Sequence, residues 1–155
     1  MEKIDKLKKI FKREKIDGYI IPKNDEFFSE YIPDHNDRLN FISGFSGSYG
    51  LALILKDKNY LFVDGRYTLQ ANNQSKTNFE VITIPDKMPS DILRRRKLLI
   101  GFDPNLFTKK SLSIFFGKSE CKYKPILKNL IDEIWKRKIK NNVNKFFYTT
   151  GWICM

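Results

Sequence analysis

Two short apolar runs joined by a brief polar link most strongly limit the folds open to this chain. Residues 51–55 and 60–63 are rich in aliphatic and aromatic side chains, and Lys-Asp-Lys-Asn connects them. A four-residue link of this kind is typical of a hairpin between antiparallel strands. A hairpin excludes a sheet in which every strand runs in the same direction. Any α/β fold of this chain must therefore contain a mixed sheet.

Strand-like and helix-like patterns alternate along the rest of the chain. Apolar residues recur at helical spacing in 4–11 and 127–135, with charged residues between them. Shorter helices are expected near 25–31, 36–42, 66–71, 86–93 and 108–116, and further strands at 19–21, 79–84, 98–102 and 121–125. This alternation predicts an α/β domain with a mixed sheet and helices on both faces.

The composition is strongly basic, with a net charge of +11. A basic surface is compatible with nucleic acid, acidic lipid or an acidic partner protein. Here the lysines are spread through nearly every segment, and no nucleic-acid-binding motif accompanies them. We therefore expect a solvated basic surface and no nucleic-acid partner.

Cysteine usage and the first residues indicate a compartment. Cys121 and Cys154 are the two cysteines, too few for a disulfide framework. The charged start lacks the apolar stretch of a signal peptide. No apolar run approaches the roughly 18–20 residues that a membrane span needs. The sequence therefore predicts a reducing, cytoplasmic location without membrane contact.

Histidine chemistry is restricted to one residue, His35, in a polar turn. A catalytic metal site normally needs three or more His, Cys or carboxylate ligands held together. A Ser-His-Asp or Cys-His arrangement would have no histidine other than His35 to use as its base. We expect His35 to be an exposed loop residue. The sequence therefore predicts no catalytic and no metal-ligating residue in this chain.

Glycines punctuate a turn before the predicted hairpin, at Gly44, Gly47 and Gly50. Their spacing differs from the G-x-G-x-x-G fingerprint of dinucleotide-binding proteins, and the turn precedes a strand instead of a helix. Glycine there allows positive φ or close approach of the backbone. We expect a structural role for these glycines, with positive φ at Gly47, and for Gly65 in the next turn.

Two cationic features remain. Arg94–Lys97 has two interpretations, contact with phosphate or, more typical of such a run, a helix end where positive charge suits the carbonyl terminus. Asp64-Gly65-Arg66-Tyr67 follows a predicted strand, at the kind of sheet edge where α/β proteins bind ligands. Arg66 has two equally favoured interpretations, a guanidinium that binds a carboxylate or a structural ion pair with Asp64 or another acid.

Several of these segments occur together in one family. Residues 17–22, 29–32, 41–50, 64–71 and 129–135, with Arg38 and Gly101-Phe102-Asp103-Pro104, resemble the amino-terminal domain of long-form Xaa-Pro aminopeptidases, also called aminopeptidase P. The resemblance covers about residues 4–139 and implies a ribonuclease-H-like creatinase/prolidase N-terminal fold.

The resemblance also implies a function for the parent protein. Members of this metallopeptidase family are hydrolases that remove the amino-terminal residue of a peptide when proline follows it in the second position. Their catalytic pita-bread domain holds two divalent metals, usually manganese, and the amino-terminal domain contributes to the cleft and to the dimer. By this resemblance Arg66 lies at the substrate cleft, and the domain itself carries no cofactor.

The chain departs from the family pattern towards its end. The stretch 85–97 is shortened and lacks the usual tryptophan, and 136–155 lacks the proline-rich linker. We expect one domain at 1–139 and a linker remnant or aberrant tail at 140–155, with the second and catalytic domains absent. The expected function is a non-catalytic fragment of a cytoplasmic aminopeptidase. The alternative is a free-standing peptide- or protein-binding module for acidic partners.

Overall fold

The computed structural model describes residues 2–137. Its strands are β1 (Gly18–Pro22), β2 (Gly50–Leu55), β3 (Asn59–Asp64), β4 (Glu80–Ile84), β5 (Leu99–Phe102) and β6 (Lys122–Pro125). Its helices are α1 (Glu2–Glu14), α2 (Arg38–Ser43), the short 3-10 turn η1 (Gly65–Tyr67), α3 (Thr68–Ser75), α4 (Pro89–Ile92), η2 (Pro104–Leu106), α5 (Lys109–Phe116) and α6 (Leu130–Ile134). Every predicted strand is present.

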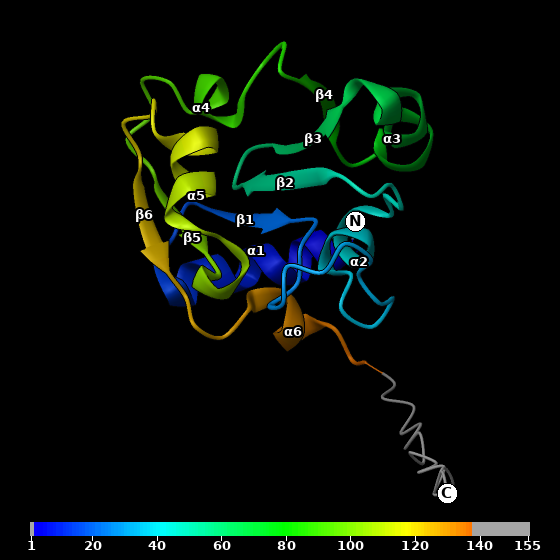
Figure 1. Ribbon diagram of the computed structural model, residues 1–155. Coiled ribbons are helices and arrows are strands. Elements are labelled where there is room, and N and C mark those ends of the chain that lie inside the picture. The colour runs from blue at the N-terminus through cyan, green and yellow to red at the C-terminus, as the bar shows by residue number, and fades with distance from the viewer. Residues whose placement is uncertain (1, 138–155) are drawn as a thin grey trace, which may run out of the picture.

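One sheet joins the six strands in the order β4-β3-β2-β1-β5-β6 (Figure 1). Strand β2 runs antiparallel to both of its neighbours, and the remaining pairs are parallel. The predicted hairpin is confirmed, with Leu53 opposite Tyr60 and Leu51 opposite Phe62. The mixed sheet expected from the hairpin is therefore the observed one.

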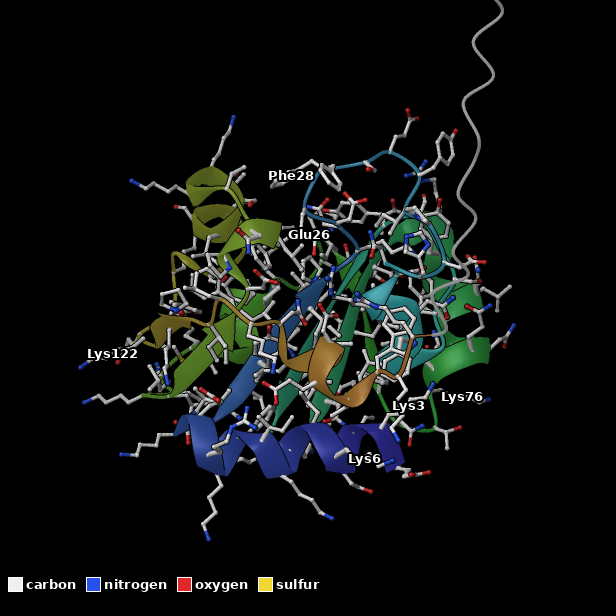
Figure 2. All side chains as sticks on the ribbon, turned by 90° about the horizontal axis from the view of Figure 1, so that it is seen from below. Lys3, Lys6, Glu26, Phe28, Lys76 and Lys122 are labelled. Atoms are coloured by element: carbon white, nitrogen blue, oxygen red, sulfur yellow. The ribbon has the colours of Figure 1, made fainter. Side chains whose placement is uncertain are left out.

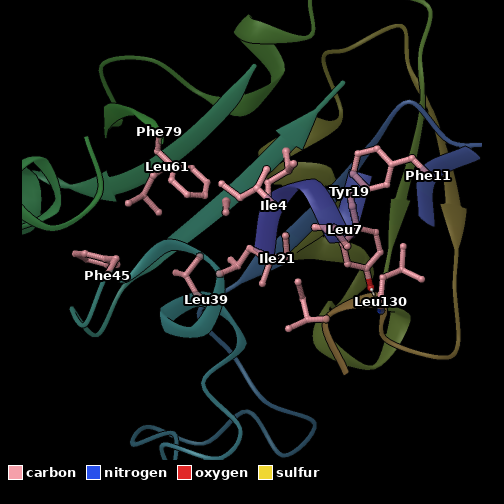
Figure 3. Packing of buried hydrophobic residues seen from close by; sticks show 14 of the residues in the cluster. Ile4, Leu7, Phe11, Tyr19, Ile21, Leu39, Phe45, Leu61, Phe79 and Leu130 are labelled. Carbon is pink, nitrogen blue, oxygen red and sulfur yellow. Dashed lines mark hydrogen bonds between the residues drawn. The ribbon is translucent and has the colours of Figure 1, made fainter. Parts of the chain in front are cut away.

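The first face of the sheet packs against α1, α2, α3 and α6. Ile4, Leu7 and Phe11 of α1 are buried against Tyr19 and Ile21 of β1, as Figure 3 shows. The three helix positions share one stripe because the α-helix repeats every 3.6 residues. Burying each large apolar side chain contributes about 1.5–3 kcal/mol, so this face holds much of the core.

The second face packs against α4 and α5. Ile20 lies between Tyr19 and Ile21 in sequence but joins the other cluster, because successive strand residues point to opposite faces. Phe62 of β3 and Phe116 of α5 are buried in the same cluster. The prediction of helices on both faces is confirmed.

The short helix expected at 25–31 does not form. The Asp25 carboxylate accepts hydrogen bonds from the backbone N–H groups of Phe27 (3.1 Å) and Ser29 (2.9 Å), which closes a local turn instead. Phe28 has a φ of 54°, and Tyr31 lies exposed. The apolar residues of this segment have no core face to cover, so nothing stabilises a helix against the competing turn.

The last helix is shorter than its apolar period indicates. Leu127 lies before the helix and is exposed. Asn129 caps α6 by accepting a hydrogen bond from the N–H of Ile131, and its amide nitrogen donates to Asp103 at 2.8 Å. Because this buried pair fixes the cap, the helix begins at Leu130.

The arginine run lies in a turn that follows α4. Arg95 has a φ of 61°, and Arg96 pairs with Asp57 at 3.3 Å. No helix within residues 2–137 has both the length and the apolar character to cross a bilayer. The tail expected at 140–155 lies outside the described residues.

Candidate functional site

All six strands meet at one edge of the sheet. The strands β1, β3, β4, β5 and β6 end there, and the antiparallel β2 begins there at Gly50. Open α/β sheets bind ligands outside the carboxyl ends of their strands. This carboxyl edge is therefore the candidate site, and its loops carry most of the residues singled out in the sequence.

The Arg66 side chain lies at this edge in an exposed ion pair. The Asp64 carboxylate accepts hydrogen bonds from the Arg66 backbone N–H (3.0 Å), from Nε (3.3 Å) and from Nη2 (2.7 Å). The hydrogen bond from Arg66 lowers the pKa of the Asp64 carboxyl. The Arg66 side chain is nevertheless 77% exposed. The structure thus shows the ion pair with Asp64 and leaves the side chain accessible, whereas binding of a ligand carboxylate stays a prediction.

The ion pair uses only one side of the guanidinium. Asp64 binds the edge formed by Nε and Nη2, and within residues 2–137 Nη1 makes no hydrogen bond. The Tyr67 ring lies beside the group, with 5.5 Å from the guanidinium carbon to the ring centre. An arginine so held is oriented by its neighbours and can still donate two parallel hydrogen bonds from its outer end.

The glycine turn differs in one respect from the sequence prediction. Gly44 has a φ of 78° and ends α2, whereas Gly47 has no positive φ, so the expectation for Gly47 is wrong. What Gly47 provides is close approach, because a Cβ there would lie 2.2 Å from Cζ of the buried Phe45 ring.

The other two glycines also differ from each other. A Cβ at Gly50 would lie 3.2 Å from the carbonyl oxygen of Phe62 and close to Phe45 and Leu39, so this strand position is tightly packed. At Gly65 the nearest atom would be Thr83 Cγ2 at 4.0 Å. The structure therefore gives no steric reason for glycine at position 65.

Side chains fasten this turn to the Arg66 corner. The Ser48 hydroxyl lies 2.6 Å from the Tyr67 hydroxyl. The Ser46 hydroxyl accepts hydrogen bonds from the amides of Gln70 (3.0 Å) and Gln74 (2.9 Å). The sequence did not predict these contacts, because Ser46 and Gln74 are distant in sequence and come together only when α3 packs against the turn.

Two cavities open beside this edge. An apolar cavity of about 320 Å³ is bordered by aromatic and aliphatic side chains, among them Phe28, Tyr49, Leu51, Ile84, Phe107 and Phe115. A polar cavity of about 230 Å³ lies beside it and includes Glu30, Tyr31, Asp34, Ser46 and Ser48. Lys23 borders both cavities, whereas Arg66 borders neither.

Two ion pairs of low exposure hold the loop between β1 and α2. Lys23 pairs with Asp37, and their side chains are 8% and 9% exposed. Asp37 also caps α2 by accepting a hydrogen bond from the Asn40 N–H at 3.0 Å. Because the cation and the cap share one carboxylate, the start of α2 is fixed against the end of β1.

Chemical reasoning from the sequence missed the Lys23–Asp37 pair and also Arg38, which makes more contacts. Its side chain is 3% exposed and donates to both oxygens of Asp132 (2.8 and 2.9 Å) and to Glu26 (2.5 Å). Burial alone would lower the pKa of Arg38, but the hydrogen bonds to Asp132 and Glu26 outweigh it and raise the pKa. Arg38 thus connects the loop to α6.

No metal-binding cluster occurs within the described residues. His35 is exposed in its turn, as predicted. Between residues 2 and 137 no group of three or more His, Cys, Asp or Glu side chains is placed to hold a metal ion. Residues 2–137 therefore do not supply a dinuclear metal centre, which the family resemblance assigns to the catalytic domain.

Sequence comparisons place the fold in a family. Residues 3–126 match the model of the Creatinase/Prolidase N-terminal domain. A probable Xaa-Pro aminopeptidase P of Coprinopsis cinerea is 37% identical over 139 residues, which cover 83% of this chain and 22% of that protein. The Xaa-Pro aminopeptidase ApepP of Drosophila melanogaster is 33% identical over 129 residues, covering 77% of this chain and 21% of the relative. The chain thus spans about a fifth of the length of these relatives.

Solved structures agree with the sequence comparison. The X-prolyl aminopeptidase of Caenorhabditis elegans, described as a cytosolic enzyme with a di-nuclear active site, superposes with a TM-score of 0.78 at 33% identity. That match covers 86% of this chain and 25% of the other. The N-terminal domain of the peptidase PepQ from Mycobacterium tuberculosis shares the fold, with a TM-score of 0.66, 22% identity, and coverage of 86% of this chain and 98% of that one. The chain therefore belongs to the creatinase/prolidase N-terminal domain family, as the counterpart of the amino-terminal domain of Xaa-Pro aminopeptidases.

Proposed function

We propose that this chain acts as the non-catalytic amino-terminal domain of an Xaa-Pro aminopeptidase. The observation that carries the proposal is the match of most of the chain to about a fifth of each aminopeptidase relative. The described residues add no metal-holding cluster. In this proposal another part of a longer protein hydrolyses the peptide bond. That part would hold two divalent metal ions, and manganese is the metal we propose.

Arg66 is the residue that we propose to reach the substrate in that longer protein. Its outer edge is free to hold a peptide carbonyl or carboxylate through two parallel hydrogen bonds, while Asp64 fixes the inner edge. Both the carboxyl edge of the sheet and the exposure of the side chain suit this role. Arg66 would then position peptide and take no part in bond cleavage.

Hydrolysis tests the proposal directly. The purified chain, supplied with manganese and an Xaa-Pro peptide, should show no turnover. A long-form aminopeptidase that carries this domain should cleave the same peptide under the same conditions. Turnover by the isolated chain that persists through repurification and follows the protein would overturn the proposal.

Location and assembly extend the same proposal. We propose a cytoplasmic parent that forms a homodimer to which this domain contributes. The nematode relative described as cytosolic supports the location. The alternative of a free-standing module for acidic partners gains no support, because the curated relatives reported above are described as aminopeptidases. Cell fractionation and sedimentation of the longer protein would test both statements.

A further inference from the structure

Exposed aromatic side chains gather at the carboxyl edge. Within residues 2–137 the exposed aromatic residues are Phe27 (82%), Phe28 (50%), Tyr31 (83%) and Tyr49 (43%). Figure 2 shows Phe28 on a loop that stands out from the body of the domain. Single exposed apolar residues are ordinary, but a group of them beside an apolar cavity is typical of a binding surface.

The loop that carries three of these aromatic residues is firmly anchored. Its base is held by the buried Arg38, which binds Glu26, and by the Lys23–Asp37 pair at the other end. Asp25 is buried, and its carboxylate accepts hydrogen bonds from two backbone N–H groups within the loop. The aromatic residues are therefore presented on a fixed frame, which reduces the ordering cost of binding a partner.

The same loop is acidic in a basic protein. Residues 24–36 contain neither Lys nor Arg, although the chain has a net charge of +11. Glu30 and Asp34 are exposed, border the polar cavity, and make no ion pair with any residue in 2–137. At physiological ionic strength screening acts over about 8 Å. Charges farther from the loop than this distance are therefore largely screened, and the loop itself contributes negative charge.

We infer that this edge docks a basic, apolar segment of another polypeptide. An apolar side chain of that segment enters the cavity bordered by Phe28 and Tyr49. A neighbouring Lys or Arg side chain meets Glu30 and Asp34, with the exposed Tyr31 ring available to the same cation. The two cavities share Lys23, whose charge is neutralised by Asp37, so one short segment reaches both.

The inference does not depend on the proposed function and reverses the expectation from net charge. A protein of charge +11 attracts acidic peptides if only its overall field matters. Two fluorescent hexapeptides test the sign, one with Leu-Phe flanked by Lys and Arg and one with Leu-Phe flanked by Glu and Asp. Fluorescence anisotropy at about 0.15 M salt should show the basic peptide binding roughly tenfold or more tightly, the change that 1.4 kcal/mol gives.

Variants locate the site. The double variant Glu30→Lys and Asp34→Lys should weaken binding of the basic peptide about tenfold, because it removes the carboxylates that meet the cation. Phe28→Ser should weaken binding by a similar factor, because it removes an aromatic ring from the apolar cavity. Leu127→Ser and Glu120→Lys are matched controls, because both residues are exposed and neither borders the apolar or the polar cavity, and both variants should bind as the parent chain does. Circular dichroism establishes that each variant is folded.

Three results would overturn the inference. They are tighter binding of the acidic peptide, basic-peptide binding that both loop variants leave unchanged, and absence of basic-peptide binding at millimolar concentration. If one loop variant fails to fold, the other still decides, because the charge pair and the aromatic ring are changed separately.

Discussion

Arg38 and Arg66 both pair with carboxylates, but in opposite surroundings. The Arg38 side chain is 3% exposed and holds Glu26 and Asp132, which are far apart in sequence. The Arg66 side chain is 77% exposed and holds Asp64, two residues away. Breaking a buried pair is costly, because the remaining charge has neither water nor a partner. Breaking an exposed pair costs little, because water solvates the remaining charge. The comparison teaches that burial, more than pairing, separates a structural arginine from one available to a ligand.

The largest expected effect is at the buried arginine. Arg38→Met should lower the free energy of unfolding by about 2–4 kcal/mol, somewhat below the loss for a fully enclosed pair, because Asp132 and Glu26 keep some contact with water. Urea unfolding measures it. The matched variant Arg66→Met should leave the urea midpoint unchanged. Equal losses in the two variants would remove the distinction between the regions.

The next largest effect concerns the glycine turn that contacts the Arg66 corner, and it tests whether close packing fixes the backbone of that turn. Gly47→Val should destabilise the domain by about 1–3 kcal/mol, because the new Cβ would lie 2.2 Å from Cζ of Phe45, whose side chain is buried in the core. Gly65→Ala is the control, since its Cβ would meet Thr83 Cγ2 at 4.0 Å, an ordinary van der Waals distance. Thermal unfolding compares them, and a Gly47→Val protein as stable as the control would show that the turn is freely adaptable.

Asp17 offers an intermediate case, because its side chain is 34% exposed. The Leu99 N–H and then the Lys56 ammonium lower the pKa of its carboxyl against the opposing effect of burial. A lowered folded-state pKa stabilises the protein above the unfolded value of about 4, and this stability disappears as the pH falls through the folded-state pKa.

The expected consequence is a difference in acid sensitivity. Asp17→Asn should lose less than about 1 kcal/mol at neutral pH, and its stability should fall less steeply below pH ~4 than that of the parent chain. Urea midpoints measured across this range supply the test. Identical slopes in the two proteins would mean that Asp17 does not titrate differently on folding.

The sequence predicts the framework well, because the framework depends on local periodicity. The hairpin, the strand at 98–102 and the amphipathic α1 are each specified within their own residues. The exposure of Arg66 and its pair with Asp64 are local for the same reason. The sequence patterns that mark a strand end and a following turn are therefore sufficient to locate the corner.

The Arg38 cluster could not be predicted in this way. Its partners lie 12 and 94 residues away, so only the folded chain brings them together. Gly47 shows a related limit, since glycine permits both positive φ and close contact, and only the position of the Phe45 ring distinguishes them. The apolar spacing near 25–31 misled because the Asp25 carboxylate competes for the same backbone donors.

One kinetic measurement tests the central claim that Arg66 is kept available for peptide. In a long-form Xaa-Pro aminopeptidase that carries this domain, Arg66→Ala should lower kcat/KM roughly tenfold or more while the melting temperature stays unchanged. Arg66→Lys should recover only part of the loss, because a single ammonium does not reproduce two parallel hydrogen bonds. An Arg66→Ala enzyme with parental kcat/KM would contradict the claim and leave Arg66 as a surface ion pair with Asp64.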